Sequence, residues 1–249
     1  MPRPHRATPA GYCYHVLNRG NARQQVFHKG PDFAAFVNLF DAAHEHFPMR
    51  ILGFCLLPNH FHLVLWPRAD GDISRWMQWV QTTHVRRYHE HYRTSGHVWQ
   101  GRFKAFPIQE NEHLLTVLRY VERNPLRAGL VTEVNAWPWS SLAVQSRLEA
   151  PVWYSNGPVP RPRDWLTWVA HPQTDMELLA LRRSAQRGVP YETNPKLEIQ
   201  ILETTSAWII RDLNLFRISC FGFAVGCTEG VPYRAGGLSG EPSAARPTS

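Results

Sequence analysis

The clearest pattern of hydrophobic and polar positions is a pair of strand-like runs joined by a turn. Residues 51–57 are almost entirely apolar, residues 58–59 (Pro-Asn) are a turn signal, and residues 60–66 set two histidines among large apolar side chains. Because side chains of a strand alternate between its two faces, His60 and His62 are predicted to point the same way. A sheet, rather than a loop, is expected to hold this pair.

The same periodicities predict the other elements of the first half of the chain. A strand is expected at residues 11–17, and helical spacing predicts helices that open at residues 31 and 71. Residues 99–108 are predicted to be a further strand, and residues 110–124 a third helix that stops at Pro125. The first six elements follow the order β-α-β-β-α-β, which predicts an α+β fold: a ferredoxin-like antiparallel sheet with packed helices.

Beyond about residue 140 the periodicity weakens. Short helices are expected at residues 164–169 and 174–186, and residues 137–141 are expected to pack as a cap over the edge of the domain. The end of the chain is rich in Gly, Ser, Ala and Pro, a composition that favours disorder. The predicted segments are a basic arm (1–10), a main domain (11–145), a short helical extension (146–190) and a divergent, partly disordered tail (191–249).

Charge and cysteine content narrow the class of protein. The net charge of +7 suggests a polyanionic partner, and 12 of the 13 histidines precede residue 140. The four cysteines form no C-x-x-C pair, so neither a zinc ribbon nor a disulfide framework is predicted. The N-terminus lacks the apolar region of a signal peptide, and no apolar run approaches membrane-spanning length. A cytoplasmic location is therefore expected.

Two pairs of residues carry candidate chemistry. Two imidazoles on one strand face can converge on a single divalent ion, which makes His60 and His62 candidate metal ligands. Tyr120 and Asn124 lie one helical turn apart, where a tyrosine could attack a phosphodiester and an amide oxygen could join a metal shell. Taken alone, each pair is more often explained by packing than by a site.

Several separated motifs occur in a recognisable order. They are Leu57-Pro58-Asn59-His60-Phe61-His62, Trp99-Gln100-Gly101-Arg102-Phe103, and residues 120–131 (YVERNPLRAGLV), preceded by Tyr14-His15-Val16 and residues 18–21. With these motifs, residues 10–145 resemble the REP-associated tyrosine transposases. That family is related to the single-tyrosine HUH transposases of bacterial insertion sequences.

The resemblance implies an HUH endonuclease fold with an extra catalytic helix, and an enzyme of DNA transposition and recombination. Such an enzyme is a metal-dependent endonuclease and strand transferase that cleaves single-stranded DNA at or near palindromic repeat hairpins. His60 and His62 would hold Mg²⁺ or Mn²⁺, with Asn124 as a third ligand. Tyr120 would form a 5′-phosphotyrosine intermediate and release a 3′-OH. A monomer or a homodimer is expected.

Basic and aromatic residues are candidates for contacts with DNA. Tyr88, Tyr92 and Trp99 could stack on unpaired bases, although core packing explains any one of them equally well. Two other functions stay open: a protein that binds repeat hairpins without cutting them, and a metal nuclease that activates water. The chain departs from the family pattern after Tyr191. The candidate DNA-binding residues are Arg3, Arg6, Arg19, Arg86, Arg87, Arg102, Lys104 and Arg123.

Overall fold

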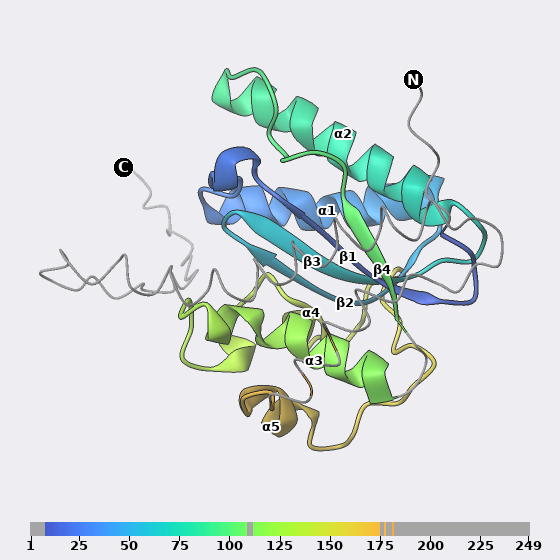
Figure 1. Cartoon of the computed structure of the whole chain (residues 1–249). Helices are drawn as coiled ribbons and strands as arrows, with labels where there is room; N and C mark the ends of the chain where they lie inside the picture. Colours follow the sequence, from blue (N-terminus) through green and yellow to red (C-terminus); the bar gives the residue numbers. More distant parts are fainter. Residues whose placement is uncertain (1–7, 109–111, 175–176, 178–180, 182–249) are drawn as a thin grey trace, which may run out of the picture. The chain divides into compact units, whose positions relative to one another are not determined.

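A four-stranded antiparallel sheet organises the chain. The computed structural model describes residues 8–108, 112–174, 177 and 181, all within one compact unit, Met1–Arg211. The sheet has the order β2-β3-β1-β4, which is the ferredoxin-like order, so the predicted α+β fold is confirmed (Figure 1). Its strands are β1 (Cys13–Arg19), β2 (Arg50–Leu57), β3 (His60–Trp66) and β4 (Lys104–Ile108).

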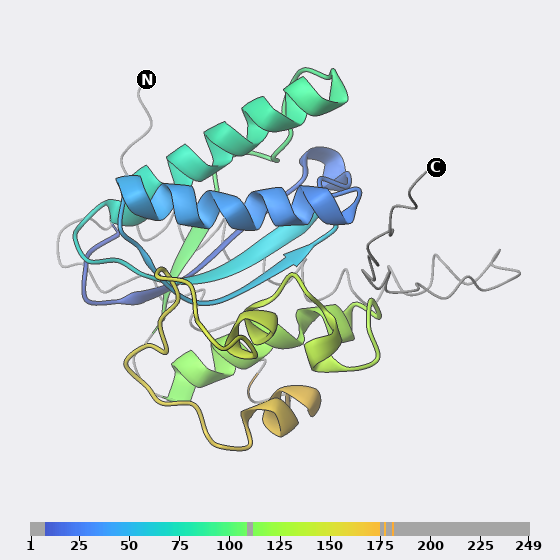
Figure 2. The ribbon, with the colours of Figure 1, turned by 180° about the vertical axis from the view of Figure 1, so that it is seen from behind.

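Helices cover both faces of this sheet. Figures 1 and 2 show α1 and α2 on one face and α3 on the other. The large aromatic core lies between the sheet and the α1–α2 layer. In the described part of the chain, the helices are α1 (Gly30–His46), α2 (Asp72–Tyr92), α3 (Glu112–Arg127), α4 (Ser141–Gln145) and α5 (Trp165–Ala170), with 3₁₀ turns η1 (Asn21–Arg23) and η2 (Val134–Ala136).

The faces of β3 are divided as its alternation predicted. Phe61, Leu63 and Leu65 are buried in the core under α1 and α2. His60 and His62 therefore point to the opposite face, where α3 lies. The sheet thus separates the chain's largest apolar core from its pair of histidines.

The predicted end of the third helix is wrong. Helix α3 continues through Pro125 to Arg127, and the amide of Ala128 still donates to the Asn124 carbonyl. A proline removes its own amide donor and its ring crowds the carbonyl four residues earlier, and burial of Leu114, Leu118 and Val121 offsets that cost. The continuation adds one more turn to the face that carries Tyr120.

The predicted strand at residues 99–108 is shorter than expected. Only Lys104–Ile108 pairs as β4, whereas Trp99 joins the sheet through a single bridge to Gly20. Trp99 packs in the core beside Phe27 and Phe61, so the proposal that it stacks on DNA bases is wrong. The free energy gained by burying this large ring outweighs that of further hydrogen bonds along the strand.

The outer edge of β2 is covered by the chain that follows α3. Leu56 N donates to Trp139 O, Trp137 Nε1 donates to Leu56 O, and Ile51 N donates to Trp153 O. The predicted cap at residues 137–141 is confirmed, and α5 matches the helix expected at 164–169. Because Trp153 is buried in the same core, packing continues past the boundary predicted at residue 145.

Two further predictions concern parts of the chain that the structure describes only partly. The helix expected at 174–186 and the tail at 191–249 lie largely or wholly outside the described residues. In the residues described, no helix combines the length and apolarity that crossing a bilayer requires.

Candidate active site

Strand β3 and helix α3 bring the two predicted pairs of residues together. The ring centroids of His60 and His62 lie 5.1 Å apart, and those of His62 and Tyr120 lie 5.7 Å apart in an edge-to-face arrangement. All three side chains are more than nine-tenths buried. Residues 58 positions apart in the sequence thus share one enclosed site.

Asn124 lies one turn beyond Tyr120 and is fully buried. Its Nδ2 donates to the Tyr120 carbonyl at 3.2 Å. Its Oδ1 is buried and accepts no hydrogen bond from any residue that the structure describes. A buried amide oxygen without a donor is costly, which favours a role as a ligand over a packing role.

Both histidines of β3 are held at the same ring atom. His60 Nδ1 donates to Asn59 Oδ1 at 2.6 Å, and His62 Nδ1 lies 2.9 Å from His15 Nε2 on β1. Asn59 is oriented in turn, because its Nδ2 donates to the Arg23 carbonyl. These contacts occupy Nδ1 of each ring, so a metal ion would have to bind at Nε2.

The electrostatics of the site favour neutral imidazoles. Burial, with a smaller contribution from Arg19, lowers the pKa of His60 to about 3. Burial and the neighbouring His60, His15 and Arg19 hold the pKa of His62 well below its ordinary value. Burial, together with His113, lowers the pKa of His15 to about 4. At neutral pH these rings therefore carry the lone pairs that metal binding needs.

Two arginines give the site a positive surrounding. Arg19 is buried at the end of β1, directly opposite His60 in the sheet. The guanidinium of Arg127 lies 5.6 Å from the centre of the Tyr120 ring. Both cations contribute to the lowered pKa of His62, and both would attract a phosphate group.

The donor set fits a hard divalent cation that shares its shell with substrate. No cluster of three or more His, Cys, Asp or Glu side chains among the described residues could enclose a metal alone. Two imidazole nitrogens and the Asn124 oxygen are an incomplete shell, which phosphate oxygens could complete. We refer to His15, His60, His62, Tyr120 and Asn124 as the histidine site.

The predicted DNA contacts are spread over several parts of the fold. Arg19 borders the histidine site opposite His60, and Lys104 lies on the neighbouring strand β4. Arg86 and Arg87 are exposed on α2, which covers the other face of the sheet. Arg102 is exposed in the loop before β4. Their contacts with DNA stay predictions, as do those of Arg3 and Arg6, which lie outside the described residues.

Three of the predicted contacts have roles within the protein. Arg123 donates to the carbonyls of Ala170 and His171 at the end of α5. Tyr92 donates to the Asp32 carboxylate at 2.6 Å, and Tyr88 Oη lies 3.0 Å from His28 Nε2. Contact with DNA would have to compete with these interactions, so it too stays a prediction.

A second buried polar cluster lies on the opposite side of α3. The Oε1 atom of Glu122 accepts from Ser141 and Gln145, each at 2.7 Å, and its Oε2 accepts from Trp165 at 2.6 Å. Arg161 Nη2 lies 3.5 Å from the same carboxylate and donates to the Leu52 carbonyl. Glu122, Ser141, Gln145, Arg161 and Trp165 form what we call the Glu122 cluster.

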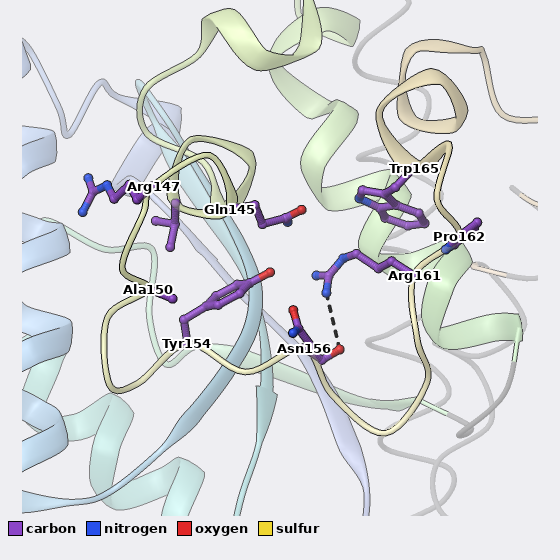
Figure 3. Close-up of a pocket in the computed structure, with 9 residues that line it drawn as sticks. Gln145, Arg147, Ala150, Tyr154, Asn156, Arg161, Pro162 and Trp165 are labelled. Carbon is purple, nitrogen blue, oxygen red and sulfur yellow. Dashed lines mark hydrogen bonds between the residues drawn. The ribbon is translucent and has the colours of Figure 1, made fainter.

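The Glu122 cluster borders a cavity of about 490 Å³ between α4, α5 and the loop that joins them. Figure 3 shows the Arg161 side chain pointing into this cavity, between Tyr154 and Trp165. The guanidinium is already engaged by Glu122, Leu52 and the Asn156 carbonyl. Its charge is thus used within the protein, in an ion pair with Glu122.

Three residues of the site were missed at the sequence level. His15 required knowledge of how β1 pairs with β3. Asn59 was read only as a turn residue, although it adjoins His60. Arg127 lies seven residues after Tyr120 on the same helical face, and the helix end wrongly placed at Pro125 concealed it. Helical spacing alone would have found Arg127.

Comparison with known proteins identifies the family. Residues 10–124 match the family model described as "Transposase IS200 like". A putative REP-associated tyrosine transposase of Haemophilus influenzae is 31% identical over 121 residues, which cover 43% of this chain and 68% of the relative. The chain belongs to the REP-associated tyrosine transposases. A second family member, from Escherichia coli, is 28% identical over 97 residues, covering 38% of this chain and 54% of that protein.

Two solved structures are similar to this chain at low sequence identity. A REP-associated tyrosine transposase bound to a REP hairpin is 20% identical, with a TM-score of 0.48, and the match covers 62% of this chain and 91% of that one. A putative transposase of Deinococcus radiodurans is 15% identical, with a TM-score of 0.34, covering 49% of this chain and 96% of that one.

Proposed function

We propose that this family member is a metal-dependent endonuclease and strand transferase that cleaves single-stranded DNA at or near palindromic repeat hairpins. The observation that carries the proposal is the convergence of His60, His62 and Tyr120 in one buried, positively surrounded site, with Asn124 buried one helical turn beyond Tyr120. A packing role alone does not account for the Asn124 amide oxygen, which is buried and accepts no hydrogen bond from any described residue.

In the proposed reaction, Tyr120 is the nucleophile. Its oxygen attacks phosphorus, a phosphorus–oxygen bond to the tyrosine forms, and the bond to the 3′ oxygen breaks. The tyrosine hydroxyl loses a proton and the leaving 3′ oxygen gains one, which gives a 5′-phosphotyrosine and a free 3′-OH. Because the covalent link keeps the ester, the reverse step can join the strand to another 3′-OH without ATP.

The other residues prepare this step. Asn59 holds the His60 ring, and β3 presents His60 Nε2 and His62 Nε2 on one face as ligands for Mg²⁺ or Mn²⁺. When bound, the cation supplies polarisation of the scissile phosphate. Arg19 and Arg127 place positive charge beside the phosphate. The edge-to-face packing of Tyr120 on His62 fixes the direction of its ring.

The proposal is tested with end-labelled hairpin DNA from palindromic repeats near the gene of this protein, incubated with Mn²⁺ or Mg²⁺. The wild-type protein is expected to cleave and to migrate with a bound strand on a denaturing gel. Tyr120→Phe keeps the packing ring and removes the oxygen, so nicking should fall to background while the fold persists. An adduct with Tyr120→Phe would identify another nucleophile, and cleavage without any adduct would favour activation of water.

A further inference from the structure

The contact between His15 and His62 links a residue outside the family motif of paired histidines to the proposed metal ligands. His15 lies on β1 opposite Val64, which makes it the diagonal neighbour of His62. The two rings are nearly parallel, with centroids 5.1 Å apart and an interplanar angle of 23°. His15 Nε2 and His62 Nδ1 lie 2.9 Å apart, the distance of a nitrogen–nitrogen hydrogen bond.

This hydrogen bond has two possible directions, and they have opposite consequences for His62. If His15 donates, His62 accepts at Nδ1 and a neutral ring must carry its proton at Nε2, so Nε2 has no lone pair for a ligand. If His15 accepts, His62 carries its proton at Nδ1 and Nε2 is available. Nδ1 of His62 cannot serve instead, because His15 occupies that position.

Resting on the proposed function, we propose that His15 is a positioning residue that accepts the Nδ1 proton of His62 and so turns its Nε2 atom into a metal ligand. Asn59 performs the same task for His60, where the acceptor is an amide oxygen. Each β3 histidine then has a dedicated acceptor, from the β2–β3 turn for one and from β1 for the other. Such outer partners orient ligands and raise their basicity.

Two substitutions separate the hydrogen bond from the packing of the ring. His15→Phe keeps a flat ring beside His62 but offers no acceptor. His15→Gln loses the ring and places an amide oxygen near the position of His15 Nε2. His84→Phe is the matched control, because His84 is another buried histidine, and it packs between Phe36 and Trp99 in the layer on the other side of the sheet.

The measurement is Mn²⁺ binding to the DNA-free protein by isothermal titration calorimetry, with thermal melting in chelator to confirm folding. His15→Phe is expected to weaken Mn²⁺ binding by roughly 10–100-fold, and His15→Gln and His84→Phe by less than about fivefold. ¹⁵N spectra of histidine-labelled, metal-free protein should show His62 protonated at Nδ1 in the wild type and not in His15→Phe.

The outcomes distinguish this proposal from the proposed function. Wild-type affinity in a folded His15→Phe variant overturns the role of His15 and leaves the metal site intact. Equal losses in His15→Phe and His15→Gln also overturn it, because the acceptor would then not be what matters. A wild-type protein that binds no Mn²⁺ contradicts the metal site itself, and with it both proposals.

Discussion

Two buried polar clusters lie on opposite sides of α3 and differ in how completely their polar atoms are hydrogen-bonded. Glu122 follows Tyr120 by two residues, a rotation of about 200° around the helix. In the Glu122 cluster, three donors and one cation surround the carboxylate. In the histidine site, the Asn124 oxygen has no donor among the described residues, and the rings of His60 and His62 lie with their centroids 5.1 Å apart.

The difference separates a structural role from a functional one. A buried carboxylate is tolerated when every oxygen is hydrogen-bonded, and Glu122 then fastens α3 to β2, α4 and α5. A buried acceptor atom without a donor lowers the free energy of unfolding unless a bound ligand supplies the missing interaction. We infer that the Glu122 cluster holds the helix in place so that its other face can present Tyr120 and Asn124.

The largest expected effect comes from breaking the satisfied cluster. Glu122→Ala leaves Arg161 buried without its partner charge and three donors without an acceptor. The free energy of unfolding at pH 7 should fall by about 3–5 kcal/mol, measured by urea denaturation. Glu122→Gln keeps an acceptor oxygen and should cost less. A loss below about 1 kcal/mol in Glu122→Ala would mean that the cluster does not fasten the helix.

An intermediate effect on stability is expected at His84. This residue does not fit the comparison, because it is buried and incompletely hydrogen-bonded but has no proposed function. Its Nδ1 is buried without a hydrogen bond among the described residues, yet its surroundings are aromatic and it lies outside the histidine site. Burial, aided by Arg87, lowers the pKa of His84 to about 3, from an ordinary value of 6.5. The unfolded chain therefore gains a proton at this position as the pH falls below 6.5, and the folded chain does not.

This difference predicts a pH dependence that His84→Phe should remove. The contribution of the neutral, buried His84 to the free energy of unfolding is complete above pH 6.5. It is lost at about 1.4 kcal/mol per pH unit as the pH falls toward 3. Between pH 6.5 and 4.5 the wild type should lose about 2–3 kcal/mol more than the variant, by urea denaturation at each pH. Parallel stability curves for the two proteins would contradict the assignment.

The smallest effect on stability is expected at Asn124. Asn124→Leu replaces an amide whose oxygen accepts from no described residue with an apolar group of similar volume, so the free energy of unfolding should change by less than about 1 kcal/mol. Mn²⁺ binding should weaken on the order of tenfold, because an oxygen ligand is lost. Calorimetry and urea denaturation of the same sample check both. A large loss of stability with unchanged Mn²⁺ binding would make Asn124 structural.

The sequence by itself determined which residues share a face. Alternation along residues 60–66 placed His60 and His62 together, and helical spacing paired Tyr120 with Asn124. These are local consequences of backbone geometry and need no knowledge of neighbouring segments. The family motifs then joined the two pairs into one expected site, and the ferredoxin-like order of elements followed from the same periodicities.

Only the tertiary structure decided how separate segments meet. The register of β1 against β3 set His15 beside His62, and sequence spacing carries no information on that register. Packing against the sheet carried α3 past Pro125 and placed Arg127 near Tyr120, where local propensity predicted a stop. Burial drew Trp99 into the core for the same reason: the free energy of long-range packing outweighs the weaker preferences of a local segment.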